Sequence, residues 1–346
     1  MGFTLDRANL TPASPRRVLI TGASGLLGLN LALELAPHFQ VFGQVHTHRL
    51  KVVSKAAGVI GLGEAVFDQG RFRVVETDLL DAGCLERMLD ETRPDWIIHC
   101  AALANLDACE ADPRQAEAIN ADLPGKLAAW VHARRGTGEQ LPRLLHVSTD
   151  AVFDGERGNY TEEDVPNPLS VYARTKLAGE ARVLDADPEA IVARVNLFGW
   201  SLLGRRSLAE LFFYTLQSGK PMMGFVDVIF CPLLVNDLAA IFSGMLKRQL
   251  RGIYHVVSSE SLSKYAFGLA IAEKFGFDPA LVIPTRVADA GLKAARAPNL
   301  NLRSDKLASA LGAPLPRISP AIHRFWELYQ QGYPQKLRAL LDDAAH

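Results

Sequence analysis

The strongest indication of how this chain folds is Val18-Leu-Ile-Thr-Gly-Ala-Ser-Gly-Leu-Leu-Gly28. Three apolar residues, Val18 to Ile20, predict a short buried strand, and three glycines follow it at once. Gly22 permits a tight turn, Gly25 lets backbone N–H groups reach a pyrophosphate, and Gly28 lets the following helix pack closely. The N-terminus of that helix favours a negative charge. The stretch therefore predicts a dinucleotide-binding turn, with incidental glycines at the start of a helix as the alternative.

The rest of the chain repeats the strand-then-helix order. Short apolar runs lie at 40–45, 72–75, 96–101, 144–147 and 191–195, and helical stretches lie at 26–35, 82–91, 114–134 and 171–185. Strands that alternate with helices at this spacing predict βαβ units and a parallel sheet. Uniformly apolar strands are typical of a sheet covered on both faces. We expect an α/β protein with a Rossmann-type doubly wound parallel sheet.

The C-terminal third differs in composition, because prolines interrupt its short helical stretches. We expect it to form a smaller mixed substrate-binding domain whose chain also returns to the sheet. The predicted division is a flexible N-terminal extension at 1–15, a dinucleotide-binding domain at 16–195 plus 226–258, and a substrate-binding domain at 196–225 plus 259–340.

Charge and composition narrow the classes of partner. The 346 residues include 37 Lys and Arg against 38 Asp and Glu, a net charge of −1 that gives no electrostatic reason to expect nucleic acid or a membrane. The N-terminus lacks an apolar signal segment, and no apolar run approaches the roughly 18 residues that span a bilayer. The four cysteines form no CxxC pair, so we expect buried free thiols, no metal and a cytoplasmic setting.

Three side chains fit proton chemistry at a carbonyl. Tyr172 and Lys176 are four residues apart, on one face of a helix that is expected to begin near Ser170. A tyrosine titrates near pH 10, and a neighbouring ammonium is expected to lower that pKa. Thr149, farther upstream, could polarise the carbonyl. A surface tyrosine beside a solvated lysine is the alternative, but the order of the parts favours a carbonyl/alcohol oxidoreductase.

The residues directly after two of the strands predict the adenosine end of the site. The second strand runs into His46, Arg49 and other basic or neutral residues without a carboxylate, which favours NADP(H), with NAD(H) or a solvated basic loop as alternatives. Asp78 ends another strand, where it could accept the adenine amino group or cap the next helix. His99 is expected to be a core histidine.

These residues resemble the extended short-chain dehydrogenase/reductase superfamily across nearly the whole chain. Within it, Ser148-Thr-Asp-Ala-Val-Phe-Asp-Gly155 followed by Tyr160-Thr-Glu162 is most similar to the dTDP-4-dehydrorhamnose reductase branch. The resemblance implies catalysis by Thr149, Tyr172 and Lys176 and substrate contacts from Asp150 and Asn196. It implies cofactor contacts from Gly22, Ser24, Gly25, Leu26, Leu27, Gly28, His46, Arg49, Asp78, Leu79, Ala101, Ala102, Asn120, Tyr172 and Lys176.

Two departures affect the substrate. Ala151 stands where the branch has a sugar-contacting tyrosine, and Val228-Ile-Phe-Cys-Pro-Leu233 replaces a more polar segment. The sequence still predicts an NAD(P)H-dependent reductase of a 4-keto nucleotide-sugar. A homodimer is compatible with this prediction. The alternatives are a nucleotide-sugar epimerase or dehydratase with tightly bound NAD, and a non-catalytic regulatory subunit resembling the β subunit of methionine adenosyltransferase.

Overall fold

A computed structural model describes residues 15–46, 50, 60–61, 71–136, 142–290 and 297–341. Residues 1–14 of the predicted N-terminal extension and the basic residue Arg49 lie outside the described residues, so the expectations that concern them stay predictions.

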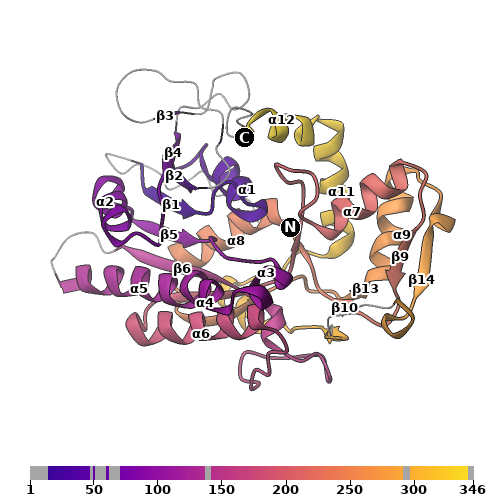
Figure 1. Cartoon of the computed structure of the whole chain (residues 1–346). Helices are drawn as coiled ribbons and strands as arrows, with labels where there is room; N and C mark the ends of the chain where they lie inside the picture. Colours follow the sequence, from indigo (N-terminus) through magenta and orange to yellow (C-terminus); the bar gives the residue numbers. More distant parts are fainter. Residues whose placement is uncertain are drawn as a thin grey trace.

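A parallel sheet of seven strands forms the centre of the molecule (Figure 1). Its order is β12-β7-β6-β5-β1-β2-β4, and the short β3 (Ile60–Gly61) pairs antiparallel at the outer edge of β4. The parallel strands are β1 (Arg17–Thr21), β2 (Gln40–Val45), β4 (Phe72–Glu76), β5 (Trp96–His99), β6 (Arg143–Thr149), β7 (Ile191–Val195) and β12 (Gly252–Val256). The order reverses between β1 and β5, and in such sheets ligands bind in the crevice at this point. The predicted Rossmann-type fold is confirmed.

Each face of the sheet is covered because successive residues of a strand point to opposite sides. Val18 and Ile20 of β1 pack into one apolar cluster, and Leu19 between them packs into another. The first cluster includes α1 (Leu26–Leu35), α8 (Val235–Lys247), α11 (Ile318–Gln330) and α12 (Tyr333–Ala339). The second includes α2 (Ala82–Thr92), α5 (Leu123–Ala133) and α6 (Val171–Ala186). Both faces are buried, as the apolar strands predicted.

The helix predicted at 114–134 is divided into three parts. The α4 helix (Pro113–Glu117) leads into a π-helical turn at Ala118–Asp122, and α5 follows. Pro124 has no N–H, so it cannot close the α-helical hydrogen bond to the carbonyl of Asn120. That carbonyl faces α6, where a Cβ added to Gly179 would lie 2.2 Å from the oxygen. The π turn therefore lets α6 pack closely against this segment.

The remaining segments form a smaller unit beside the sheet (Figure 1). Its parallel pair β9 (Met222–Phe225) and β14 (Val282–Thr285) lies against α9 (Lys264–Phe275), which also contacts α7 (Leu208–Gln217). Short strands link this unit to the sheet: β8 (Leu197–Phe198) pairs with β11 (Leu233–Leu234), and β10 (Ile229–Phe230) pairs with β13 (Leu262–Ser263) and β15 (Asn299–Leu300). The other helices are α3 (Leu106–Ala111) and α10 (Asp305–Leu311).

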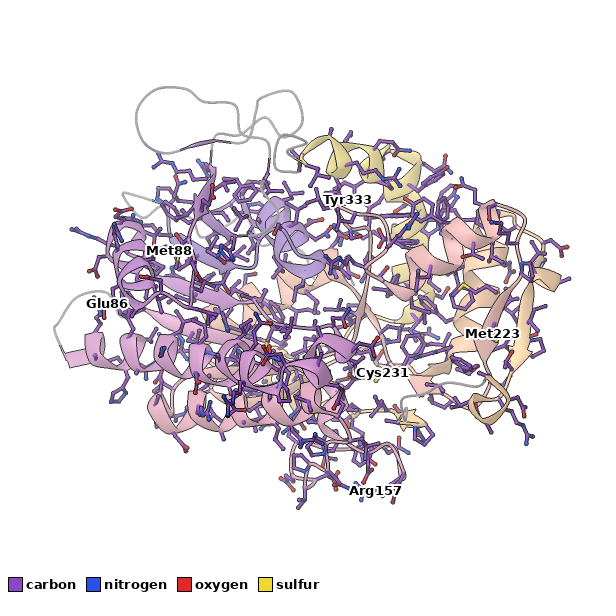
Figure 2. All side chains as sticks on the ribbon, viewed as in Figure 1. Glu86, Met88, Arg157, Met223, Cys231 and Tyr333 are labelled. Carbon is purple, nitrogen blue, oxygen red and sulfur yellow. The ribbon has the colours of Figure 1, made fainter. Side chains whose placement is uncertain are left out.

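The C-terminal helices return to the nucleotide half through a buried polar contact. The hydroxyl of Tyr333, labelled in Figure 2, donates to Asn30 Oδ1 of α1 at 2.8 Å. Asn30 Nδ2 donates to the carbonyls of Leu26 and Trp200 at 2.7 and 2.9 Å. The amide of Asn30 is thus satisfied by three segments of the chain. Among the helices of the described residues, none has the length and apolar character that crossing a membrane requires.

Candidate active site

The glycine turn fits a bound dinucleotide because side chains cannot occupy it. Gly22 has a φ of +67°, and a Cβ there would lie 2.9 Å from Ala101 N. A Cβ on Gly28 would lie 2.4 Å from the carbonyl oxygen of Gly22. Gly25 is the N-cap of α1 and supplies no side-chain cap, which leaves the first N–H groups of the helix for an anion. The turn is therefore both closely packed and open to phosphate.

Thr21, for which the sequence predicted no role of its own, joins the turn to β5. Thr21 Oγ1 accepts hydrogen bonds from Cys100 N at 3.1 Å and Ala101 N at 3.2 Å. The same oxygen lies 2.7 Å from His99 Nδ1, so the Thr21 hydroxyl proton is directed at that nitrogen. Gln44 braces the other side, because its Oε1 accepts from Gly22 N at 2.9 Å. The sequence signal that could have identified Thr21 is its position as a polar residue at the end of an apolar strand.

The predicted adenosine-side residues flank the ends of β2 and β4. His46 follows β2 and is exposed, and Leu79 is buried. Asp78 Oδ1 accepts from Leu80 N at 2.9 Å, while Asp81 caps α2 by accepting from Cys84 N at 2.8 Å. The structure thus excludes the helix cap as the role of Asp78.

The side chain of Asn120 is buried and bonded within the protein, unlike a side chain that is free to contact a cofactor. Its side chain is 1% exposed; Oδ1 accepts from Leu103 N at 2.9 Å, and Nδ2 donates to the carbonyl of Leu103 and to Thr175 Oγ1, each at 3.1 Å. These contacts tie the segment after β5 to α6. Asn120 therefore fixes the surroundings of the crevice from within the protein.

Thr149 and Tyr172 meet at the carboxyl end of β6. Thr149 ends the strand, and Tyr172 lies in the first turn of α6, where the Ser170 side chain accepts from Ala173 N at 3.2 Å. Glu110 Oε1 of α3 accepts from Val171 N at 2.8 Å and so holds the start of the helix. The Thr149 side chain lies close enough to the Tyr172 hydroxyl to act on its pKa. The structure brings these two predicted catalytic side chains together.

The expected lowering of the Tyr172 pKa is wrong for this state of the protein. Burial raises the pKa of Tyr172 to about 12, and the neighbouring Thr149 side chain only partly opposes the rise. The Nζ atom of Lys176 donates instead to the Val147 carbonyl at 2.7 Å. Tyr172 therefore carries its proton at neutral pH, which is the state that a proton donor needs.

Two buried histidines lie behind Lys176. His146 Nε2 is 3.4 Å from Lys176 Nζ, and the His146 ring stacks on His99 with centroids 5.3 Å apart. Burial lowers the pKa of His99 to about 3, and it lowers the pKa of His146 well below its usual value. Both rings are therefore neutral, and His146 Nε2 can accept from the ammonium. Burial lowers the pKa of Lys176 to about 8, and Glu180 opposes that change.

The predicted substrate residues Asp150 and Asn196 are in contact. Asn196 Nδ2 donates to Asp150 Oδ2 at 2.5 Å, and the Thr149 hydroxyl donates to Asp150 Oδ1 at 3.2 Å. Burial raises the pKa of Asp150, and these hydrogen bonds and the charge of Lys264 oppose the rise. Lys264, at the start of α9, is a charged neighbour that the sequence analysis did not select. These groups place polar chemistry beside Thr149.

In the segment 228–233, which departs from the pattern of the reductase branch, Cys231 has a structural role. This thiol is buried and lies where the sheet meets the smaller unit (Figure 2). Its Sγ donates to the Leu300 carbonyl at 3.4 Å and accepts from Leu302 N at 3.4 Å. All four cysteines are free thiols.

Comparisons with known proteins agree with this geometry. The model of the family described as "RmlD substrate binding domain" matches residues 16–331. The probable low-salt glycan biosynthesis reductase Agl14 of Haloferax volcanii is 32% identical, over 86% of this chain and 93% of that protein. The methionine adenosyltransferase 2 subunit beta of Danio rerio is 30% identical over 84% of each chain.

Solved structures that resemble this chain include dTDP-4-dehydrorhamnose reductases. The hypothetical dTDP-4-dehydrorhamnose reductase of Sulfolobus tokodaii has a TM-score of 0.69 and 30% identity, over 87% of this chain and 97% of that one. The dTDP-4-dehydrorhamnose reductase of Bacillus anthracis in complex with NADP, 24% identical over 91% and 99% of the two chains, has a TM-score of 0.73 and supports the fold. The predicted superfamily and enzyme class are confirmed. The chain belongs to the RmlD substrate-binding-domain family and is an oxidoreductase of the extended short-chain dehydrogenase/reductase type.

Proposed function

We propose that the protein is a reductase of a 4-keto nucleotide-sugar that uses a nicotinamide dinucleotide, with NADP(H) preferred. The observation that carries the proposal is the contact of Thr149 with a protonated Tyr172 at the carboxyl end of β6, on the crevice side of the sheet. The similarity to the Haloferax volcanii reductase supports the reaction class.

The chain fits the cofactor at its glycine turn, where Gly22 and Gly28 have no room for a Cβ. In the proposal, the N–H groups of Leu26 and Leu27 at the start of α1 hold the pyrophosphate, while Ser24 lies within the same turn. Ala101 lines the crevice beside Gly22. When bound, the reduced nicotinamide supplies the hydride that the substrate carbonyl takes up.

The remaining predicted contacts complete the cofactor proposal. The adenine end is assigned to Asp78 and Leu79, and Ala102 extends the strip begun by Ala101. Preference for NADP(H) rests on His46 and on the lack of a carboxylate after β2 in the sequence. The ratio of kcat/KM for NADPH to that for NADH measures this preference directly.

Side chains of the protein supply the proton that the substrate oxygen takes up. Tyr172 gives its hydroxyl proton to the substrate oxygen as negative charge develops there. The Thr149 hydroxyl, which donates to Asp150 Oδ1 in the structure, turns to donate to the same oxygen. Lys176 has three N–H groups. The Val147 carbonyl and His146 Nε2 engage two of them, and the third is assigned to the nicotinamide ribose. Asp150 and Asn196 orient the sugar.

The direct test is Tyr172→Phe. We expect kcat for NADPH oxidation to fall by roughly 10² to 10⁴, because the general acid is lost. A panel of 4-keto dTDP-, UDP- and GDP-sugars supplies the substrate, and NADPH fluorescence checks that the cofactor still binds. Tyr329→Phe is the matched control, since the half-buried Tyr329 lies on α11, where its hydroxyl accepts from Gln217 Nε2 at 3.4 Å. Undiminished turnover by Tyr172→Phe would contradict the assigned role.

The similarity to a regulatory subunit suggests a second candidate function, which the same assay tests. Methionine adenosyltransferase 2 β subunits are 30–33% identical to this chain over 75–84% of its length. A regulatory subunit would bind the dinucleotide and a synthetase without oxidising NADPH on any sugar. Co-purification with a methionine adenosyltransferase and silence across the panel would favour this function over the reductase.

A further inference from the structure

The face of α6 that carries Tyr172 and Lys176 carries a third polar side chain. Glu180 follows Lys176 by four residues and Tyr172 by eight, so the three lie along one side of the helix. Glu180 is 2% exposed. A carboxylate at such depth requires partners. The hydrogen-bond partners of Glu180 show which strands this part of the helix is attached to.

Glu180 joins the helix to two strands of the sheet. Its Oε1 accepts from the Ser148 hydroxyl at 2.5 Å and from Arg194 Nε at 3.0 Å. Its Oε2 accepts from Arg194 Nη2 at 2.7 Å. Ser148 immediately precedes Thr149 on β6, and Arg194 lies on β7. One carboxylate thus connects the helix of Tyr172 with the strand of Thr149.

The arginine is itself held in a fixed place. Arg194 is 2% exposed, its guanidinium carbon lies 5.1 Å from the centre of the Phe153 ring, and Nη1 lies 3.5 Å from His255 Nε2. The bidentate pairing with Glu180 restricts orientation as well as distance. Hydrophobic residues of similar volume can often replace a buried ion pair without loss of stability, so such a pair is weak evidence for a purely stabilising role.

Glu180 also acts on Lys176 through its charge. Burial lowers the pKa of Lys176, and the first influence that raises it is the carboxylate of Glu180. The neighbouring imidazoles are neutral and supply no counter-charge. Within the described residues, the helix therefore carries its own anion one turn beyond the lysine.

We propose that Glu180 is a positioning residue that fixes Thr149 against Tyr172 through Ser148 and, while paired with Arg194, favours the charged form of Lys176. This role rests on the proposed reductase function, because it concerns the geometry of that same site. The carboxylate does not contact the space assigned to substrate. It acts instead on Thr149, Tyr172 and Lys176.

Two variants separate positioning from general stability. Ser148→Ala removes one hydrogen bond and leaves the Glu180–Arg194 ion pair intact. We expect its kcat to fall on the order of tenfold with KM for NADPH unchanged, because small displacements of a positioned group are costly. Ser243→Ala is the matched control: Ser243 is also buried, and its hydroxyl donates to the Ala240 carbonyl within α8, at 3.0 Å.

Glu180→Gln tests the charge. The loss of the anion is expected to move the basic limb of the kcat–pH profile to lower pH, which a merely structural role would not do. Circular dichroism verifies the fold, and Ser148→Ala decides the question if Glu180→Gln does not fold. Equal kcat for Ser148→Ala and Ser243→Ala would overturn the positioning role alone. Absence of turnover by the unaltered protein on every sugar would overturn the proposed function, and the positioning role with it.

Discussion

At the scale of single residues, the most informative group is Lys176. Burial lowers its pKa to about 8, whereas burial raises the pKa of Tyr172 to about 12. Lys176 is therefore ionised below pH 8 and loses its charge as the pH rises through that value, while Tyr172 keeps its proton throughout.

We predict that kcat for the accepted sugar falls as the pH rises above about 8, since the ribose-binding ammonium is lost. The check is a kcat profile from about pH 6 to about pH 10 at saturating NADPH, a range that spans the ordinary titration of tyrosine. A profile that stays level throughout would show that Lys176 keeps its proton in the working enzyme. The stability of the fold at each pH is followed by circular dichroism as a control.

The sequence identified individual side chains better than their environments. The four-residue spacing of Tyr172 and Lys176 was enough to place them on one helical face. The direction of the Tyr172 pKa was predicted wrongly, because spacing says nothing about burial or about which partners take the lysine's hydrogen bonds. His146 and Glu180 were missed for the same reason, since their importance arises from contacts across strands.

At the scale of elements, glycine decides where a helix and a turn can meet. A Cβ on Gly28 would lie 2.4 Å from the Gly22 carbonyl oxygen, and backbone cannot move aside cheaply. The same substitution is harmless where a helix is open. In α8, a Cβ on Gly244 would make an ordinary contact, 3.5 Å from Leu311 Cδ2.

We predict that Gly28→Ala weakens NADPH binding at least tenfold, because α1 must shift away from the turn that its N-terminus faces. Gly244→Ala is the control and is expected to leave binding unchanged and to stabilise the fold by up to about 1 kcal/mol. Fluorescence titration and urea unfolding measure the two effects. Equal NADPH affinity in both variants would contradict the close packing at Gly28.

Regular elements were predictable where a period or an apolar run was long enough to detect. Six strands of the parallel sheet were predicted within a few residues, although the run at 96–101 ends as a strand at His99. The seventh, β12, was expected only as a return of the chain to the sheet within 226–258. The π turn was not predicted, even though Pro124 is visible in the sequence. Two-residue strands such as β8 and β11 have no detectable pattern and depend on tertiary pairing.

At the scale of the whole molecule, three buried histidines link stability to pH. Burial lowers the pKa of His99 and of His255 to about 3, and it lowers the pKa of His146 well below the ordinary value. The unfolded chain binds a proton at each position near pH 6.5, whereas the folded chain does not. Stability is therefore complete above this pH and is lost as the pH falls toward 3.

We predict that the free energy of unfolding declines below pH 6.5 by about 1.4 kcal/mol per pH unit for each of these histidines. His255→Gln should reduce the slope by about one proton. The unaltered protein is measured in parallel and supplies the reference slope. Urea unfolding at a series of pH values gives the slopes, and equal slopes for His255→Gln and the unaltered protein would contradict the prediction.

The buried amide of Asn30 has a consequence for synthesis of the chain. Its hydrogen bonds come from α1, from Trp200 and from Tyr333 near the C-terminus. A ribosome releases the N-terminal half of the chain first, yet Asn30 Oδ1 lacks its Tyr333 partner until residue 333 has emerged. The hydrogen bonds of this buried amide are therefore completed only when nearly the whole chain has been synthesised.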